Sequence, residues 1–176
     1  MENSEDTLEW EGEVEEKEKK ERSTSDTSNS EKQDIRKWFN AKKRKHTNKI
    51  LVKRLSNQAR VPTKKSQEAA GYDLIAPVPV YVPPTSSRII GTKIALQIPK
   101  GYYGRIAGRS GLAKDFQLTI LGGVIDSDYR GEIKVLLFNL GAYPVDLPEH
   151  SRIAQIIIAK NSRRSRNGGD NRIRSY

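Results

Sequence analysis

The sequence predicts an all-β domain, a barrel or jelly roll with one short helix, between about residues 50 and 160. Three observations predict this class. From Ile50 onward the chain consists of short runs rich in Val, Ile, Leu and Tyr; glycines and prolines separate these runs; and the runs have the lengths of strands. A chain of 176 residues has room for one such domain of ordinary size with a tail on each side.

Within this domain, the pattern of each segment supports its assignment. Eight segments are expected to be strands: residues 50–55, 78–82, 88–98, 102–107, 116–121, 132–140, 143–147 and 152–159. Apolar and polar residues alternate in Lys93–Ile98, as in a strand with one buried face. Lys134–Leu140 is almost continuously apolar, as in a strand buried on both faces. Only Ser110–Asp115 has the pattern of a helical turn.

The two flanks, residues 1–49 and 161–176, are predicted to be disordered tails. They offer few apolar side chains, and six hydroxyl residues lie within the eight residues 23–30, so little buried surface offsets the entropy of ordering. Glu and Lys recur at helical spacing in Glu13–Arg22, which predicts a transient helix there. Trp38 and Phe39 could form a short docking motif, although a chance pair is the favoured interpretation.

The net charge of +10 is distributed unevenly along the chain. Residues 1–34 are acidic, with 13 acidic and 5 basic residues; residues 35–66 carry 12 basic residues and no acidic one; and the β domain is close to neutral. A nucleic-acid function therefore cannot be assigned to the domain on charge alone. Residues 36–65 could make weak, non-specific contacts with nucleic-acid phosphates, and Lys42–Lys45 has the form of a nuclear-import signal or of a solvated tail.

Several function classes are excluded by what the sequence lacks. There is no cysteine for a disulfide, a thiolate metal site or a nucleophile, and the two histidines, His46 and His150, are far apart. No apolar run approaches the roughly 20 residues that span a bilayer, and Met1–Trp10 is acidic where a signal peptide would be basic and apolar. We expect an intracellular protein, nuclear or cytoplasmic, with no membrane partner.

Four short segments of the β region combine glycine with charged or hydroxyl residues, or place polar side chains at a strand start: Ala70–Leu74, Gly108–Ala113, Gly122–Glu132 and Arg152–Gln155. In the second segment, Arg109 supplies a guanidinium, Ser110 a hydroxyl and Gly111 an open backbone at the start of the expected helical turn. This combination suits a phosphate group, although a purely structural turn explains the same residues.

The third segment contains the candidate for acid–base chemistry. Gly122 and Gly123 permit a tight hairpin, and the apolar pair Val124-Ile125 then leads to Asp126. The Asp126 carboxylate could orient and deprotonate a water, and Tyr129 could stack on a sugar or base or exclude a 2′-hydroxyl. The alternative is an ordinary loop in which the aspartates bind turn amides and the tyrosine packs on the core.

The first and fourth segments each offer a polar pair near a strand end. Asp73 lies at an expected strand end, and Arg152 and Gln155 are three residues apart near the start of the last long strand. Arg152 could hold Asp73 in a structural ion pair, and Gln155 could donate to a phosphate. Both could equally be surface residues.

The order and content of these four segments resemble the trimeric dUTPase family, over roughly Arg60–Ala159. The resemblance implies a jelly-roll-like dUTPase β-barrel that forms a homotrimer with active sites at subunit interfaces. It also implies hydrolysis of dUTP to dUMP and pyrophosphate with Mg²⁺, which limits uracil incorporation into DNA and supplies dUMP for thymidylate synthesis.

The resemblance also implies a role for each site residue. Asp126 matches the aspartate that binds the 3′-hydroxyl and activates the attacking water, and Tyr129 matches the tyrosine that disfavours ribonucleotides. The backbone that binds uracil is represented by Gly123, Val124 and Ile125. The phosphate-binding residues, which come from a different subunit, are represented by Arg109, Ser110, Gly111 and Gln155. Asp73 matches the aspartate that reaches the metal through water, while the triphosphate oxygens hold Mg²⁺ itself.

The sequence departs from the family pattern after Ala159. Family members carry a glycine-rich fifth motif there, of which Arg166–Gly169 is at best a fragment, so low activity is expected. The alternative function is a catalytically impaired, dUTPase-derived nucleotide-binding or regulatory module. The related dCTP deaminases fit less well, because Tyr129 within Asp126–Gly131 matches the dUTP-hydrolysing form of the motif.

Overall fold

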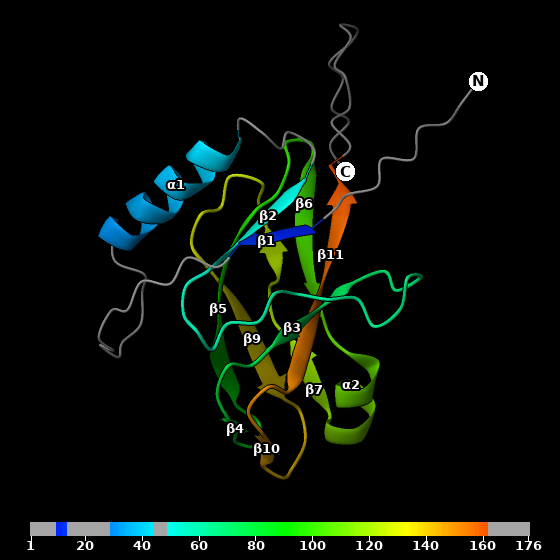
Figure 1. Ribbon diagram of the computed structural model, residues 1–176. Coiled ribbons are helices and arrows are strands. Elements are labelled where there is room, and N and C mark those ends of the chain that lie inside the picture. The colour runs from blue at the N-terminus through cyan, green and yellow to red at the C-terminus, as the bar shows by residue number, and fades with distance from the viewer. Residues whose placement is uncertain (1–9, 14–28, 44–48, 162–176) are drawn as a thin grey trace, which may run out of the picture.

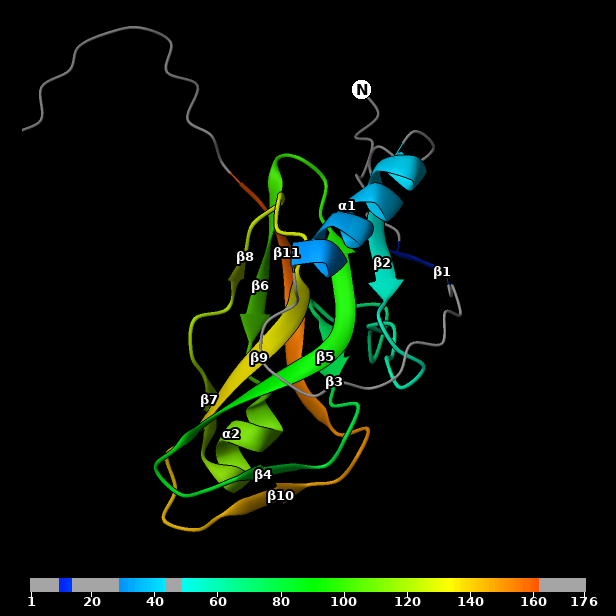
Figure 2. The same ribbon diagram turned by 90° about the vertical axis from the view of Figure 1, so that its left-hand side faces the viewer.

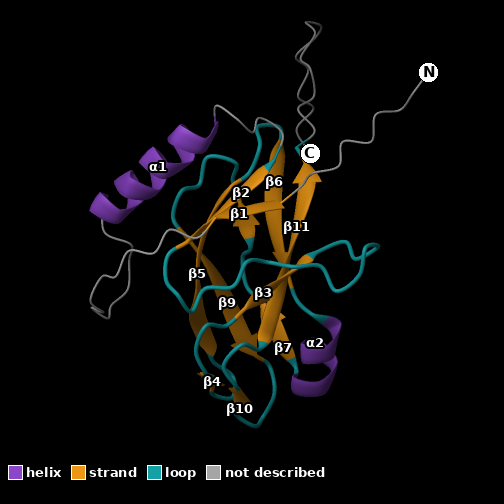
Figure 3. Cartoon of the chain, viewed as in Figure 1, coloured by secondary structure: helices purple, strands orange, loops and turns teal. Residues whose placement is uncertain are grey.

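The computed structural model describes residues 10–13, 29–43 and 49–161 (Figure 1). Two helices and eleven strands follow one another in these residues, and Figure 3 separates them by type. In chain order they are β1 (Trp10–Glu13), α1 (Asn29–Lys43), β2 (Ile50–Arg54), β3 (Tyr72–Ile75), β4 (Val80–Val82), β5 (Ser87–Gln97), β6 (Tyr102–Ala107), α2 (Ser110–Phe116), β7 (Leu118–Ile120), β8 (Val124–Ile125), β9 (Glu132–Asn139), β10 (Val145–Leu147) and β11 (Arg152–Lys160).

The strands form two main sheets and one short ribbon. A five-stranded sheet has the order β1-β2-β5-β9-β7, a four-stranded sheet has the order β3-β11-β6-β8, and β10 pairs with β4. Every pair is antiparallel except β1 with β2. The predicted all-β class is confirmed, with jelly-roll-like sheets that face each other.

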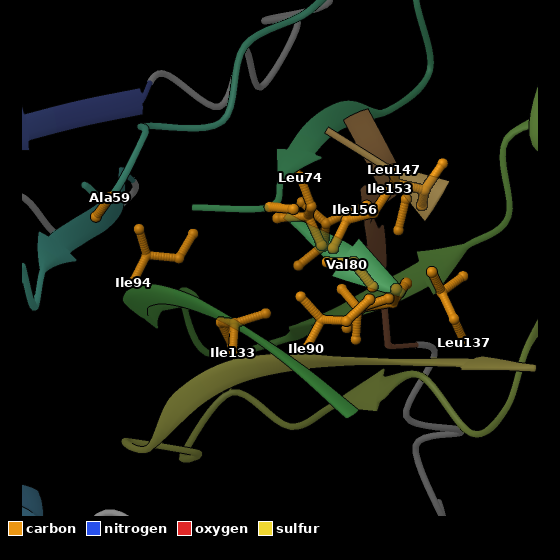
Figure 4. Packing of buried hydrophobic residues seen from close by; sticks show 14 of the residues in the cluster. Ala59, Leu74, Val80, Ile90, Ile94, Ile133, Leu137, Leu147, Ile153 and Ile156 are labelled. Carbon is orange, nitrogen blue, oxygen red and sulfur yellow. The ribbon is translucent and has the colours of Figure 1, made fainter. Parts of the chain in front are cut away.

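The core lies between the two main sheets. Leu74, Ile153 and Ile156 project from the four-stranded sheet toward Ile133 and Leu137 of β9, and all five side chains are buried (Figure 4). At one corner Asn139, which is fully buried, donates from its amide to two backbone carbonyls and accepts from a backbone N–H. A buried polar side chain with all these partners holds β9 against the neighbouring chain segments.

The predicted strand boundaries agree with the structure to within about two residues, and β6 agrees at both ends. From residue 50 onward, two short strands were not predicted as such: β3, of which only the end near Asp73 was expected, and β8, which has only two residues. Both belong to the sheet that carries the four polar segments.

The expectation of disorder before residue 50 is wrong for the residues of α1 and β1. In α1, Ile35 and Phe39 lie one helical turn apart and are buried against Leu51 of β2 and Ala95 of β5, with Trp38 packed beside them. This contact supplies the apolar burial that the composition alone did not indicate. Residues 14–22 of the expected transient helix, and the expected C-terminal tail from residue 162, lie outside the described residues.

Candidate active site

The four polar segments meet on one sheet, because each lies on, or directly beside, a strand of the order β3-β11-β6-β8. The register places Asp73 of β3 opposite Gln155 of β11, and Gln155 opposite Ala107 of β6. Three segments that are distant in sequence are therefore aligned in one row across the sheet. Backbone pairing of strands, which is more rigid than a loop, sets their relative positions.

Asp73 lies between two guanidinium groups. Its Oδ1 is 3.1 Å from Arg109 Nε, and its Oδ2 is 3.6 Å from Arg152 Nη1, while the carboxylate side chain is only 12% exposed. Arg109 also donates from Nη1 to the carbonyl of Arg152 at 3.2 Å. The ion pair predicted between Arg152 and Asp73 is confirmed. The contacts of Arg109 with Asp73 and Arg152 place its guanidinium beside the row of Asp73, Gln155 and Ala107.

Gln155 connects the other segments of this cluster. Its Nε2 donates to the carbonyl of Gly108 at 3.1 Å, directly before Arg109. A Cβ at Gly71 would lie 2.7 Å from Gln155 Oε1, so a larger residue at this position would displace the Gln155 side chain. The hydrogen bond to Gly108 holds Gln155 next to the start of α2.

The start of α2 has the features that the sequence predicts for an anion site. Arg109 occupies the N-cap position without a side-chain capping bond, so the N–H groups of the first turn remain available. Ser110 and Gly111 are exposed, and a Cβ added at Gly111 would meet no atom within 4 Å. Binding of a phosphate by these residues stays a prediction.

The third segment begins with two glycines in the left-handed region. Gly122 has φ +67° and Gly123 has φ +99°, and a Cβ at Gly123 would lie 2.6 Å from the carbonyl oxygen of Ile106. The expected hairpin is not a paired one, because β7 pairs with β9 in one sheet and β8 pairs with β6 in the other. The two glycines instead carry the chain from one sheet to the other, and the N–H of Ile106 donates to the carbonyl of Gly123 at 2.7 Å.

Val124 and Ile125 form β8, which is one of the two edge strands of the four-stranded sheet within the described part of the chain. One side of β8 pairs with Gly104 and Arg105 of β6. The opposite side lies outside the sheet pairing, and Val124 is exposed. Backbone N–H and carbonyl groups on such an edge can bind the polar edge of a planar base.

A short turn places Asp126 and Tyr129 after this strand. The N–H of Tyr129 donates to the carbonyl of Asp126 at 3.1 Å, and the exposed Asp126 carboxylate is open to a water or a sugar hydroxyl. The Tyr129 hydroxyl donates to the carbonyl of Glu132 at 3.0 Å, yet the residue is 42% exposed. The tyrosine is therefore held at its hydroxyl end and does not pack in the core.

Within one chain, Asp126 and Arg109 lie toward opposite ends of β6. Ile125, which precedes Asp126, pairs with Gly104, whereas Arg109 follows the far end of the strand. Four residues of extended chain separate Gly104 from Gly108, which is about 13 Å. Figure 2 shows β8 beside the upper part of β6 and α2 at the lower end of the sheet. One chain alone therefore does not bring Asp126 and Arg109 together.

The polar residues of this site suit a metal ion that is bound mainly by substrate phosphates better than a metal ion that is held by protein ligands alone. No group of three His, Cys, Asp or Glu side chains suitable for a metal occurs among the described residues. Asp73, the candidate carboxylate, is occupied by two guanidinium groups. Mg²⁺ is commonly held by one or two carboxylates together with substrate phosphates and waters, which agrees with this donor set.

Sequence reasoning missed one feature of the site. Arg130 donates from Nη1 to the carbonyls of Ser127 and Tyr129, at 2.8 and 2.7 Å, and its guanidinium carbon lies 5.6 Å from the centre of the Phe39 ring. The spacing of Ile35, Trp38 and Phe39 is a signal for the helix that carries Phe39, but no sequence signal indicates the contact of Phe39 with Arg130.

A family model for dUTPase matches residues 57–172, two thirds of the chain. The chain belongs to the dUTPase family. Among curated dUTPases, that of fowlpox virus is 46% identical over 111 residues, which cover 63% of this chain and 77% of the relative. The human mitochondrial dUTPase is 44% identical over 104 residues, which cover 59% of this chain and 41% of the relative.

Solved dUTPase structures have the same fold. A variant dUTPase of staphylococcal phage 80alpha aligns with a TM-score of 0.65 and 25% identity, over 74% of this chain and 92% of that one. A variant dUTPase from phage phi11 of S. aureus aligns with a TM-score of 0.62 and 24% identity, over 72% of this chain and 97% of that one, and its description names a structural Mg(II) ion. Among the described residues of this chain, no helix has the length and apolar character required to cross a membrane.

Proposed function

We propose that this chain hydrolyses dUTP to dUMP and pyrophosphate. Membership of the dUTPase family is the observation that carries this function, and curated relatives from fowlpox virus and fission yeast are named as nucleotidohydrolases of deoxyuridine triphosphate or probable ones. The alternative, an impaired binding module, is not favoured, because the residues of the first four motifs are assembled on one sheet. In the reaction, a water attacks the α-phosphorus and pyrophosphate leaves.

Asp126 and Tyr129 form the nucleoside part of the proposed site. The exposed Asp126 carboxylate binds the 3′-hydroxyl and orients the attacking water, whose proton it accepts. The Tyr129 ring, held by its hydroxyl bond to Glu132, lies under the deoxyribose and fills the space that a 2′-hydroxyl would need. Uracil binds along Gly123–Ile125, where fixed backbone groups would be left unpaired by cytosine.

Arg109, Ser110, Gly111 and Gln155 form the phosphate part of the proposed site. When triphosphate binds, the Arg109 guanidinium turns from Asp73 to a phosphate oxygen, and the open N–H groups at the start of α2 contribute further donors. Asp73, through water, and the triphosphate oxygens would hold Mg²⁺, which would supply positive charge to neutralise the phosphate oxygens.

A homotrimer completes each site. The separation of Asp126 from Arg109 along β6 supports a site that takes its nucleoside part from one chain and its phosphate part from another. A closed ring of three identical chains would then contain three equal sites, one at each interface.

Pyrophosphate release from dUTP in the presence of Mg²⁺ tests this function. Asp126→Asn preserves the size of the side chain and removes its ability to accept the proton, so turnover should fall by at least about 100-fold while dUTP still binds. The controls are dCTP, dTTP and UTP, which should be hydrolysed poorly. Equal turnover by the wild-type and Asp126→Asn chains would exclude the assigned mechanism.

Two further proposals concern the basic segment of residues 36–65. The first is that this segment makes weak, non-specific contacts with nucleic acid. The second is that Lys42–Lys45 directs nuclear import of an intracellular protein. Of that run, Arg44 and Lys45 lie outside the described residues. Two of its lysines already lie over aromatic rings, Lys53 over Trp38 at 5.5 Å and Lys64 over Tyr72 at 5.2 Å. A DNA affinity that does not change between low and physiological salt would contradict the first proposal.

A further inference from the structure

Helix α1 lies outside the part of the chain that the dUTPase family model matches, yet it contacts the loop of the proposed catalytic aspartate. The match begins at residue 57, whereas α1 ends at Lys43. Alternate residues of β2 and β5 face opposite ways: Val52 and Ile94 face the main core, while Leu51 and Ala95 face Ile35 and Phe39 of α1. Figure 2 shows α1 beside β2 and the upper part of β5.

Phe39 is the residue through which α1 reaches the loop. It is fully buried, and the Arg130 guanidinium carbon lies 5.6 Å from the centre of its ring, within the range of a cation–π contact. The Trp38 ring packs edge to face against the Phe39 ring, with 5.0 Å between the ring centres, and limits the rotation of the Phe39 ring. The ring is thus fixed by packing on the helix side and presents a face to the cation.

Arg130 in turn binds the backbone of the loop. Its Nη1 donates to the carbonyls of Ser127 and Tyr129, so one guanidinium spans the residues between Asp126 and Gly131. Burial lowers the pKa of Arg130, and the charge of Arg36 on α1 lowers it further, while Asp128 raises it. Because an arginine stays protonated at neutral pH despite such effects, the cation that the ring contacts is retained.

We propose that α1 is a brace for the catalytic loop: Phe39 holds Arg130, and Arg130 holds the backbone between Asp126 and Tyr129. Phe39 and Arg130 are positioning residues, which act on the loop backbone and not on the reacting atoms. This inference rests on the proposed function for its kinetic consequence, but the ordering of the loop is independent of it. The competing explanation is that α1 only covers the apolar outer face of β2 and β5.

The test compares Phe39→Leu with Ile35→Val in the full chain. Both remove buried carbon from the same cluster, but only the first removes the ring that contacts Arg130. In Phe39→Leu, deuterium exchange of the backbone over residues 126–131 should accelerate about two- to fivefold, the range expected for one such contact, while exchange in β11 stays unchanged. The value of kcat for dUTP should fall by a similar factor with little change in KM. Ile35→Val should change neither quantity.

A double-mutant cycle with Arg130→Lys separates the two explanations. Lysine keeps the charge but lacks the planar guanidinium, whose Nη1 donates to both carbonyls and whose carbon lies over the Phe39 ring, so Arg130→Lys alone should accelerate exchange of the loop. If Phe39 acts through Arg130, adding Phe39→Leu to Arg130→Lys changes exchange and kcat little further. Fully multiplicative effects, or equal effects of Phe39→Leu and Ile35→Val, would overturn the proposal.

Two outcomes remain distinguishable from these. If the wild-type chain does not hydrolyse dUTP, the proposed function fails, while the exchange measurements still decide whether α1 orders the loop. If Phe39→Leu does not fold, Arg130→Lys carries the test by itself, because unchanged exchange over residues 126–131 in that variant would mean that Arg130 does not hold the loop.

Discussion

Mixing two inactive variants should restore activity if each active site is shared between chains. One variant, Asp126→Asn, loses the nucleoside part of the site, and the other, Arg109→Gln, loses the phosphate part. In one chain, Asp126 follows the residue that pairs with Gly104, whereas Arg109 follows Gly108, about 13 Å further along the extended chain, so we expect each site to combine the two residues from two chains. In a mixed trimer, a site can take the intact Asp126 from the Arg109→Gln chain and the intact Arg109 from the Asp126→Asn chain. Such a site contains both wild-type residues.

The size of the recovery follows from this arrangement. In an equal mixture that assembles at random, a given site receives an intact Asp126 in half of the cases and an intact Arg109, independently, in half of the cases. About a quarter of the sites, and hence about a quarter of wild-type turnover, should be restored. The assay is pyrophosphate release after the two chains are unfolded and refolded together, with each variant refolded alone as a control. A mixture that never exceeds the mean of its two parents, although sedimentation shows mixed trimers, would refute the shared site.

Four other substitutions test the local geometry. Gly123→Ala should cost about 1–3 kcal/mol in the free energy of unfolding, measured with denaturant, because of its φ of +99° and the close carbonyl of Ile106. Gly111→Ala should change stability by less than about 0.5 kcal/mol but raise KM for dUTP, since its Cβ would occupy the open space proposed for phosphate; an unchanged KM would argue against that location. Tyr129→Ala should reduce the preference in kcat/KM for dUTP over UTP by about tenfold or more, and an unaltered preference would contradict its assigned contact with the sugar. Asn139→Ala should destabilise the fold by about 3 kcal/mol, because it leaves buried backbone groups unpaired, and should not change the preference for dUTP over UTP. A loss of less than about 1 kcal/mol in the free energy of unfolding would show that water replaces the amide.

The sequence was sufficient to predict the strands that have long apolar runs and clear breaks. β6 lies between Gly101 and Gly108 and was predicted at both ends, since glycines mark its limits. β8 has only two residues, too few for any periodicity, and its strand character depends on pairing with β6. The ion pair of Arg152 with Asp73 was foreseen from residue type alone, whereas the row that adds Gln155 depends on register.

Helix α1 shows why composition can mislead at the edge of a domain. The segment is rich in charged and polar residues, which predicts disorder, and its helical structure depends on three apolar residues that meet a sheet face distant in sequence. Ile35, Trp38 and Phe39 have the spacing of one helical face, so the signal was present. The contact of Phe39 with Arg130 could not be predicted, because the two residues are 91 positions apart and no motif links them.

The pairing of β2 with β5 also bears on where the chain can be shortened. The family match starts at residue 57, beyond β2, but Leu51–Arg54 is hydrogen-bonded to Ile94–Gln97. A fragment that began at residue 57 would turn this part of β5 into an edge strand and uncover Ile94 and Leu96. Exposed apolar edges pair with other chains, so such a fragment is expected to aggregate when it is produced, and residues before the match belong to the smallest soluble unit.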